Sequence, residues 1–309
     1  MSCLFPKLIK NPRYLPNKKN GGKPPALTDK RVEFVPVSCG KCIECRKKRR
    51  REWMVRLSEE LRGGGNPPLF VTLTISPEQM ERVPYKNSND TAKVFVKWFR
   101  ENVRKKTGKS PKHYFVTELG ENKGRIHLHG FVWANEEIVR KCWIYGFIHI
   151  GTFVNEKSIN YMTKYMLKES LDKSFTPQVF ASKGIGSNYF NRKDWKYNQY
   201  KENDTQETYR FRNGTKMYMP QYYRNKIYSD DEREKLWIEK QEKGVVYIAG
   251  EKIDIKNTDE YKNILSYYQN RAISLHGDNP DKWEWEKFAR KRRKLEKYIQ
   301  NYYKNHPPK

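Results

Sequence analysis

The stretch that decides the fold of this 309-residue chain is HYFVTELGENKGRIHLHGFVW, residues 113–133. Its two halves, residues 113–119 and 125–133, are rich in aromatic and β-branched residues, which favour strands. Residues 120–124 between them read Gly-Glu-Asn-Lys-Gly, a loop of a length that joins antiparallel strands. The pattern therefore predicts a β-hairpin.

The sequence on both sides of the hairpin predicts the rest of a small sheet. An apolar strand, LFVTLTI at residues 69–75, and an amphipathic helix over residues 92–105 precede it. A short helix over residues 135–142 with an asparagine cap, a strand over 147–154 and a helix over 157–171 follow it. The order β-α-β-β-α-β predicts an α+β fold with a ferredoxin-like, RRM-like antiparallel sheet and one added helix.

Composition divides the chain into three expected domains. Residues 63–68 read Gly-Gly-Gly-Asn-Pro-Pro, a strong helix breaker that marks the first boundary. After residue 187 the periodic pattern weakens into aromatic and basic sequence. The expected domains are a cysteine-cluster and basic arm at 1–66, the sheet domain at 67–187, and a basic, partly helical C-terminal extension at 188–309.

The two outer regions have weaker patterns. Residues 1–36 are rich in Pro, Lys and Asn and predict an extended, loop-rich arm, followed by a helix over residues 44–61. A basic helix is expected over residues 281–303. Aromatic residues at 189–200 and 222–224 either pack in a core or stack on unpaired bases.

The charge of the chain points to a polyanionic partner. Lys and Arg number 63 against 36 Asp and Glu, so the net charge is +27. Such a surplus repels itself in a compact protein unless a polyanion neutralises it, and the phosphate backbone of a nucleic acid does so. A solvated helix face is the alternative for the densest basic run. The predicted DNA-binding residues are Arg46, Lys47, Lys48, Arg49, Arg50, Arg51 and Arg125.

The sequence predicts neither a membrane protein nor a secreted protein. The longest apolar run, at residues 69–75, is far shorter than the about 20 residues that a membrane helix needs. Residues 1–10 have no apolar stretch of the length found in secretory signals. The sequence therefore predicts an intracellular protein without a membrane partner.

Two histidines lie on one face of the second hairpin strand. Side chains alternate along a strand, so His127 and His129 point to the same side, about 7 Å apart, and can converge on one divalent ion. Even pairing about the turn joins residues whose numbers sum to about 245, which sets Glu118 opposite His127. The sequence predicts a metal site of two imidazoles and one carboxylate. The alternative is a half-buried strand whose histidines hydrogen-bond locally.

Two tyrosines and two lysines form a second pattern. Tyr161 and Tyr165 are four residues apart and therefore neighbours on a helix, as are Lys164 and Lys168. A tyrosine with a pKa near its free value of about 10 is a poor nucleophile until a metal-polarised phosphate or a nearby cation activates it. The pattern predicts catalytic tyrosines assisted by lysines. The alternative is an ordinary helix with the same pattern, in which the tyrosines pack in a core and the lysines are solvated.

Four cysteines predict a structural metal site. Cys39, Cys42 and Cys45 follow one another at intervals of three, with Cys3 as a distant fourth. Thiolates at this spacing favour Zn²⁺, and disulfides are disfavoured inside cells. An iron–sulfur cluster and unligated thiols are the alternatives. The basic run directly after the cluster is typical of a nucleic-acid-binding zinc knuckle, and Cys142 is expected in a core.

Together these patterns resemble a known family. The strand at 69–75, His-x-His at 127–129 and Tyr-x-x-Lys-Tyr-x-x-Lys at 161–168 resemble the three motifs of HUH endonucleases, in the same order. The paired tyrosines with interleaved lysines are similar to those of the rolling-circle replication initiators of Microviridae, small single-stranded DNA phages. The sequence at 39–45 and Lys-Gly-Ile-Gly at 183–186 look like the gokushovirus branch.

The resemblance implies a DNA nickase and ligase. Glu118, His127 and His129 would hold Mg²⁺ or Mn²⁺ against a phosphate of origin DNA. Tyr161 or Tyr165 would attack it, leaving a 5′-phosphotyrosine and a free 3′-hydroxyl, and the ends would later be rejoined. The implied partners are single-stranded origin DNA and the host helicase and polymerase, and the implied location is the host bacterial cytoplasm.

Two other interpretations stay open. A non-enzymatic single-stranded nucleic-acid-binding protein would combine a zinc knuckle with an RRM-like sheet, and would expose aromatic side chains on the central strands. A relaxase-like transposase would use the same metal scaffold with one active tyrosine. The second tyrosine argues against the transposase.

Overall fold

The computed structural model of the chain describes residues 3–83, 88–120, 124–151, 153–170, 175–278 and 285–307. These residues form two compact units, which we describe separately. The sheet unit consists of Lys47–Lys201 and Thr205–Ile227. The cysteine unit consists of Met1–Arg46, Glu202–Asp204 and Tyr228–Lys309. The expected domains 1–66, 67–187 and 188–309 follow different boundaries and stay a prediction.

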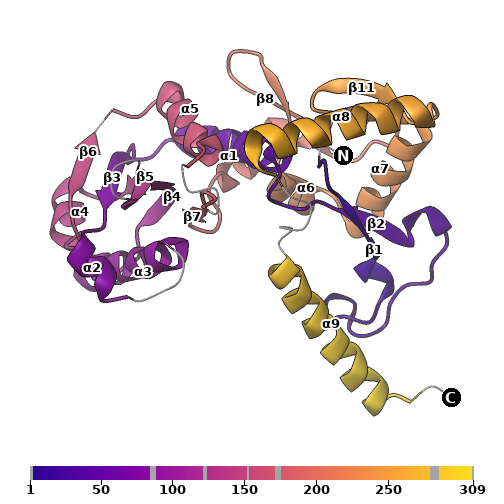
Figure 1. Cartoon of the computed structure of the whole chain (residues 1–309), viewed down its shortest axis with the longest axis horizontal. Helices are drawn as coiled ribbons and strands as arrows, with labels where there is room; N and C mark the ends of the chain where they lie inside the picture. Colours follow the sequence, from indigo (N-terminus) through magenta and orange to yellow (C-terminus); the bar gives the residue numbers. More distant parts are fainter. Residues whose placement is uncertain are drawn as a thin grey trace. The chain divides into compact units, whose positions relative to one another are not determined.

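The sheet unit is built on a five-stranded antiparallel sheet in the order β6-β3-β5-β4-β7 (Figure 1). The predicted class, a mixed α and β fold with an antiparallel sheet, is confirmed. The four expected strands are present, and β7 adds an unexpected edge beside β4. The strands are β3 (Leu69–Thr74), β4 (Lys112–Leu119), β5 (Ile126–Trp133), β6 (Ile148–Gly151) and β7 (Val179–Ala181).

The central hairpin has the register that its turn length predicts. Strands β4 and β5 pair with Glu118 opposite His127, and the backbone N–H of Gly120 donates to the carbonyl of Arg125 at 2.8 Å. The turn residues 121–123 lie outside the described residues. This register decides which side chains of β4 and β5 share a face, because side chains alternate along each strand.

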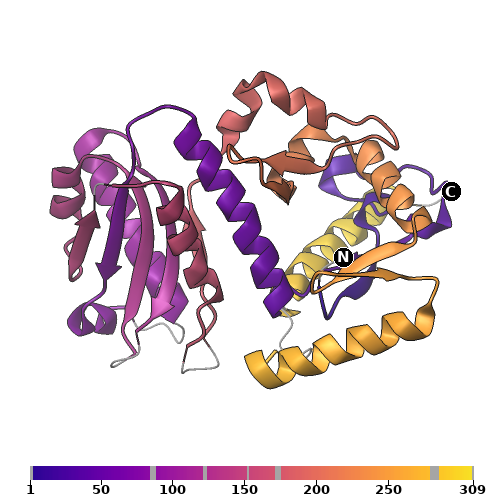
Figure 2. The ribbon, with the colours of Figure 1, turned by 90° about the horizontal axis from the view of Figure 1, so that it is seen from above.

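Helices cover both faces of the sheet, and Figures 1 and 2 show α3 and α5 on opposite sides. One face packs on α3 (Ser88–Thr107) and α4 (Glu136–Cys142), through side chains that include Phe95, Phe99 and Cys142. The other face packs on α1 (Ile43–Arg62) and α5 (Glu156–Lys164). The first core is completed by Leu69, Val71, Leu73, Phe115, Ile126, Leu128 and Val132, and the second contains Leu57, Tyr114, Val116, Phe131, Ile159, Met162 and Met166.

A third core in the sheet unit is aromatic. Tyr189 and Tyr223 are buried and stack with their ring centroids 4.6 Å apart, against Val55 of α1. Nearby, the carboxylate of Glu59 accepts hydrogen bonds from Arg192 and from other side chains. Tyr189 and Tyr223 therefore pack in a core, whereas Tyr197 of the same aromatic region is 70% exposed.

The cysteine unit contains small sheets and helices that sequence patterns did not predict. Strands β1 (Lys7–Lys10) and β2 (Phe34–Val37) pair within the segment expected to be an extended arm, so that expectation was incomplete. Strands β10 (Val245–Ile248) and β11 (Glu251–Asp254) form a hairpin, and α8 (Thr258–His276) follows it.

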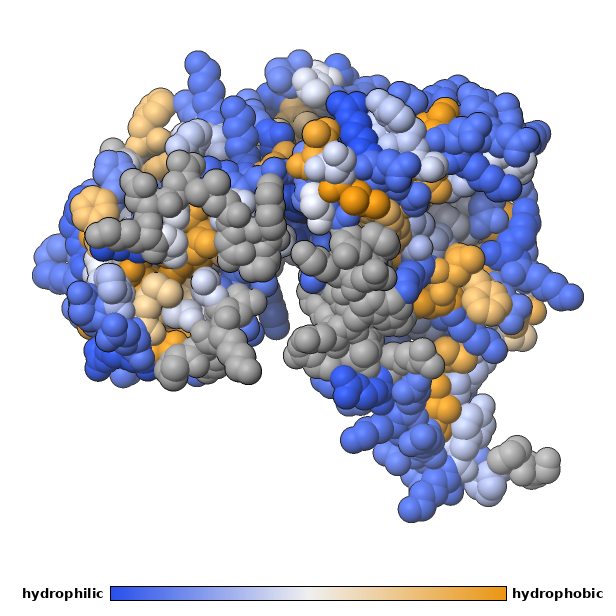
Figure 3. All heavy atoms as spheres, viewed as in Figure 1, coloured by the Kyte–Doolittle hydropathy of each residue, from blue (hydrophilic) through white to orange (hydrophobic). Residues whose placement is uncertain are grey.

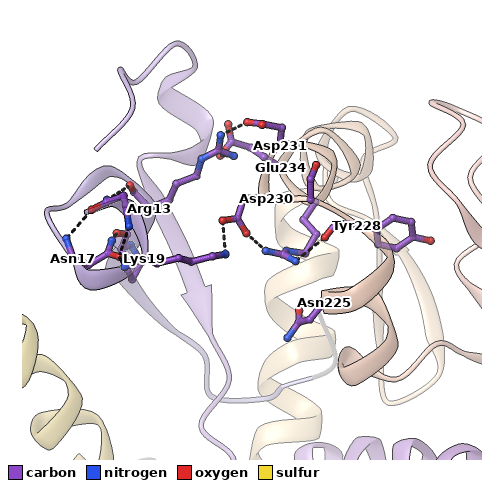
Figure 4. Close-up of polar contacts among 12 residues, drawn as sticks. Arg13, Asn17, Lys19, Asn225, Tyr228, Asp230, Asp231 and Glu234 are labelled. Carbon is purple, nitrogen blue, oxygen red and sulfur yellow. Dashed lines mark hydrogen bonds and ion pairs between the residues drawn. The ribbon is translucent and has the colours of Figure 1, made fainter. Parts of the chain in front are cut away.

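Ion pairs hold the N-terminal segment to helix α7 (Asp230–Glu242), as Figure 4 shows. The guanidinium of Arg13 contacts Asp231 and lies 3.2 Å from a carboxylate oxygen of Glu234. Lys19 contacts Asp230 at the start of the same helix. The acidic first turn of α7 thus binds cations of the arm and also complements the positive end of its own helix dipole.

Two predicted elements are shorter in the structure than expected, and a third is only partly described. The helix expected over 157–171 is α5, which ends at Lys164 and continues as a 3₁₀ turn, Tyr165–Leu167. Tertiary contacts of the turn, among them burial of Met166 in the second core, override the helical pattern. The strand expected over 147–154 is limited to β6, the stretch that pairs with β3. The helix expected over 281–303 is α9 (Trp285–Asn305), and residues 281–284 lie outside the described residues.

The remaining elements are short. The helices are α2 (Pro77–Glu81) and α6 (Gln221–Ile227), the strands β8 (Thr208–Arg210) and β9 (Lys216–Tyr218), and the further 3₁₀ turns Pro12–Tyr14, Lys18–Asn20, Lys30–Val32, Ser187–Asn191 and Lys193–Asn198.

Within the described part of the chain no helix is long and apolar enough to cross a membrane. The mean hydropathy is −1.01, and the face drawn in Figure 3 is largely hydrophilic outside the grey residues.

A close approach of two strands makes Gly130 a test of the sheet. A Cβ atom there would overlap the carbonyl oxygen of Tyr114 and would lie 2.8 Å from Cδ1 of Phe115. We expect Gly130→Ala to lower the free energy of unfolding by about 1–3 kcal/mol, measured by urea denaturation. Gly151→Ala is the matched control, because its Cβ would meet only Phe70 at 3.8 Å. Equal stability of the two variants would contradict the close approach.

Candidate active site and cysteine cluster

The predicted site residues of the hairpin lie on one face of the sheet. Along β5, Ile126 and Leu128 belong to the core under α3, so His127 and His129 project from the opposite face, which α5 covers. The sheet register places Glu118 and Thr74 on either side of His127. The three predicted metal ligands therefore share a face.

Two threonines of β3 orient the two imidazoles. The hydroxyl oxygen of Thr74 lies 3.0 Å from Nδ1 of His127, and that of Thr72 lies 3.1 Å from Nδ1 of His129. In His127, a threonine oxygen that accepts from Nδ1–H leaves Nε2 with the free lone pair of the ring, whereas His129 uses Nε2–H to donate to Glu118. Both rings thus use the same nitrogen for the backing bond and keep the other for a ligand or a proton.

Glu118 is held as a carboxylate. One of its oxygens lies 2.5 Å from Nε2 of His129, and the other contacts the ammonium of Lys168. Burial opposes ionisation of Glu118, but the hydrogen bonds from His129 and Lys168 outweigh it and lower its pKa to about 2. At neutral pH the group is therefore an anion balanced by a neighbouring cation.

His127 is held towards the neutral form. Burial and then the neighbouring His129 lower its pKa below the ordinary value. Its ring lies against Gly120, where a Cβ atom would come within 2.7 Å of Nε2. The absence of a side chain at Gly120 gives the ring its room, and a neutral imidazole is the form that binds metal ions.

Both predicted tyrosines lie beside these groups. The ring of Tyr165 stacks on that of His129, with centroids 4.2 Å apart and planes 10° from parallel. The hydroxyl oxygens of Tyr161 and Tyr165 are 2.7 Å apart, although Tyr161 is 52% exposed. Burial and the hydrogen bond to Tyr161 raise the pKa of Tyr165, so this hydroxyl needs a nearby positive charge to become a nucleophile.

The predicted cations are placed differently from one another. Lys168 contacts Glu118, whereas Lys164 and Arg125 are exposed. Arg46 is buried and its guanidinium lies 3.7 Å from a carboxylate oxygen of Asp278, so its charge is already balanced. The other residues of the basic run are half-buried on α1 and are Lys47, Lys48, Arg49, Arg50 and Arg51.

The donor set fits a divalent ion in its chemistry. Two imidazoles and one ionised carboxylate are ligands that Mn²⁺ accepts once Nε2 of His129 gives up the proton that it donates to Glu118, and Mg²⁺ prefers the carboxylate. In the structure, Glu118 hydrogen-bonds His129, so an ion bound here would replace that hydrogen bond. Thr72 and Thr74 were not among the predicted residues. The sequence feature that could have indicated them is a pair of hydroxyl residues at alternate positions of an otherwise apolar strand.

The four predicted cysteines form one compact cluster in the cysteine unit. All four Sγ atoms of Cys3, Cys39, Cys42 and Cys45 lie within 4.8 Å of one another, and all four residues are buried. The Sγ atoms of Cys3 and Cys42 are 4.0 Å apart, and those of Cys39 and Cys45 are 3.8 Å apart. Zn–S bonds of about 2.3 Å at tetrahedral angles separate sulfurs by about 3.8 Å. The cluster can therefore hold a metal ion such as zinc.

The backbone around the cluster supports thiolates. The N–H of Cys39 donates to Sγ of Cys3 at 3.2 Å, and the N–H of Cys42 donates to Sγ of Cys39 at 3.3 Å. A hydrogen bond from Cys3 is the largest effect that lowers the pKa of Cys42, to about 7, whereas hydrogen bonds within the cluster raise the pKa of Cys3 and of Cys45. Asp278 accepts from the first N–H of α1, at Ile43, which anchors the helix that carries Cys45.

The sheet region is similar in sequence to known replication-associated proteins. Residues 68–170 match the family model of the replication-associated protein ORF2. The matched range contains the hairpin, both histidines and both tyrosines. The chain is similar to phage replication-associated proteins at modest identity.

Two curated relatives have this description. The replication-associated protein ORF2 of Spiroplasma virus 4 is 26% identical over 182 residues, covering 50% of this chain and 57% of that protein. The replication-associated protein ORF4 of Chlamydia phage 1 is 24% identical over 189 residues, covering 50% of this chain and 46% of that protein. The chain thus spans about half the length of these relatives. No solved structure matches the chain significantly.

The cysteine cluster can be tested against the fifth cysteine of the chain. We expect the purified protein to contain one zinc ion per chain by elemental analysis, and Cys42→Ala to lose it, because three thiolates bind zinc less tightly than four. Cys142→Ala is the control, because Cys142 is buried in the core of the sheet unit, apart from the cluster. The site would be ruled out if both variants lost zinc, or if the unmodified protein contained no zinc.

Proposed function

We propose that this chain is a phage replication initiator of the HUH type, which nicks origin DNA through a phosphotyrosine and later rejoins the ends. The observation that carries the proposal is the meeting of Tyr161 and Tyr165 with a carboxylate and two histidines on one face of the sheet. The family match over residues 68–170 and the phage relatives support it. The element order supports a ferredoxin-like fold for this region.

The proposed reaction exchanges one phosphodiester for another. The phenolic oxygen of a tyrosine attacks phosphorus, and the bond between phosphorus and the 3′ oxygen of the neighbouring nucleotide breaks. The tyrosine loses its proton, and the departing 3′ oxygen gains one and becomes a hydroxyl. The 5′ end stays on the tyrosine as an ester, so a 3′-hydroxyl can reverse the step and reseal the strand without ATP.

The chain's own residues have separate parts in this reaction. Glu118, His127 and His129 would bind Mg²⁺ or Mn²⁺, which as a Lewis acid polarises the phosphate. Thr72 and Thr74 keep the two rings oriented. Lys168, which contacts Glu118 in the structure, would hold the phosphate or protonate the leaving oxygen. Lys164, whose side chain is exposed, is the second candidate for protonating the leaving oxygen.

The doubled tyrosine suits a cyclic process. The two hydroxyl oxygens are 2.7 Å apart, so a phosphate bound at one lies next to the other without a change in the helix. One tyrosine can hold the first 5′ end while the other cuts the regenerated origin. The 3′-hydroxyl would prime a host polymerase, with a host helicase opening the duplex, in the cytoplasm of the bacterial host.

A second function is a single-stranded nucleic-acid-binding protein without catalysis. The cysteine cluster before the basic run favours it, because such a pair of features suits a zinc knuckle. On this view Lys47–Arg51 and Arg125 would contact phosphates, and the tyrosines would be packing residues. The two functions differ in one measurable outcome. The nuclease forms a covalent protein–DNA adduct, and the binding protein does not.

The adduct decides between them. Purified protein, Mn²⁺ and a labelled single-stranded circle of the phage replicon should give a covalent protein–DNA species on a denaturing gel. Replacing both Tyr161 and Tyr165 by Phe should abolish it, with DNA affinity changed by less than about twofold, because each ring is kept and only the nucleophilic oxygens are removed. Tyr197→Phe, an exposed tyrosine of the same unit, should leave the adduct unchanged. Tight binding without an adduct under any divalent ion would favour the binding protein.

The metal assignment has its own test. We expect His127→Ala to weaken Mn²⁺ binding by at least about tenfold and to remove Mn²⁺-dependent cutting, because one imidazole ligand is lost. Calorimetric titration with Mn²⁺ alone measures the binding, and the gel measures the cutting. His306→Ala, an exposed histidine of the cysteine unit, is the control. Unchanged binding and cutting in His127→Ala would exclude His127 as a ligand.

A further inference from the structure

The face that carries the candidate site continues to the edge strand β6. Strands β3 and β6 pair with Thr72 opposite His149. Ile148 and Ile150 pack against the core under α3, so the side chain of His149 projects from the other face, the face of His129. His149 is exposed there. Sequence analysis gave this residue no role.

Phe147 extends the same face by one position. The N–H of Thr74 donates to the carbonyl of Phe147 at 2.8 Å, which continues the pairing of β3 with β6 by one residue. Alternation then puts Phe147 on the side of His149 and of His127. The row Phe147, Thr74, His127, Glu118 crosses four strands, with Phe147 about 10 Å, two strand spacings, from His127.

These side chains are aromatic and lie in solvent. Phe147 is 68% exposed, so its ring is accessible to a ligand. Tyr161 lies on the same face, with its ring 6.2 Å from that of Phe70 of β3. Exposed aromatic faces beside a phosphate-handling site are the feature that binds unpaired bases.

The charge around this surface suits the same occupant. Lys157, Tyr161 and Lys164 recur on α5 at the spacing of one helix face, and all three are exposed. The helix covers the face of the sheet that carries the histidines. Ammonium groups there can contact the phosphates of a strand whose bases reach the aromatic rings.

We infer that Phe147 and His149 form a base-stacking platform for single-stranded DNA, next to the site that handles the phosphate. The inference rests on the proposed function for the strand that occupies the site. A strand that crosses the sheet edge stacks its bases on these rings, and its backbone runs past the exposed lysines of α5 to the tyrosines. The platform tolerates every base because each has a π face, and it admits unpaired bases only, because paired bases have no free face.

The test separates stacking from charge. The background is the Tyr161→Phe, Tyr165→Phe variant, which keeps both rings and cannot cut. Fluorescence anisotropy compares oligo(dT) with an abasic oligomer of the same number of phosphates, so that both probes have equal charge. Phe147→Ala should weaken oligo(dT) binding by roughly 5- to 100-fold and leave abasic binding unchanged. His149→Ala should act in the same direction.

Matched variants sharpen the result. Phe147→Trp should keep the preference for oligo(dT), and Phe147→Leu, apolar but not aromatic, should lose it. Tyr247→Ala is the control, an exposed aromatic of the β10–β11 hairpin. Circular dichroism checks that each variant is folded. The salt dependence of binding should stay the same in all of them, because no phosphate contact is removed.

Each outcome decides the inference separately from the proposed function. Unchanged discrimination between the two probes in Phe147→Ala and His149→Ala overturns the platform, even if the unmodified protein cuts phage DNA. Equal loss on both probes also overturns it, because that result indicates a general disturbance. Loss of discrimination in a protein that never forms an adduct keeps the platform and removes the nuclease.

Discussion

The antiparallel register of β6, β3, β5 and β4 is the constraint on which the candidate site depends. A strand has a side-chain period of two, so a slip of one residue would turn its whole polar set to the core under α3. The apolar side chains that alternate with the histidines, such as Leu128, make that slip costly, because it would expose them. Packing on one face of the sheet therefore specifies the chemistry on the other.

A chain of hydrogen bonds gives the site a defined charge before any ligand arrives. Lys168 and His129 stabilise the carboxylate of Glu118, and Thr72 supports His129 from behind. A half-buried anion with such partners costs little, whereas removing either partner would leave it uncompensated. The site is thus organised around one negative group, and Lys168, which follows the 3₁₀ turn after α5, lies against it.

Local patterns were sufficient for the hairpin and for the pairing of Glu118 with His127, because turn length and alternation are properties of one short segment. They were not sufficient to predict where α5 ends. The ring of Tyr165 stacks there on His129, and such a contact between distant residues cannot be read from the spacing of apolar residues along one helix. The supporting role of Thr74 depends on sheet order, which joins residues 53 positions apart. The metal and the reaction stay predictions, and the cysteine cluster shows in the structure a geometry that its spacing only indicated.

The short contact between the hydroxyls of Tyr161 and Tyr165 has a consequence for proton traffic. In this contact one phenol donates its proton and the oxygen of the other accepts it, so the two hydroxyls are not equivalent at any moment. Rotation of the two hydroxyl groups exchanges the roles of donor and acceptor, so the fold does not fix which of the two oxygens holds the shared proton.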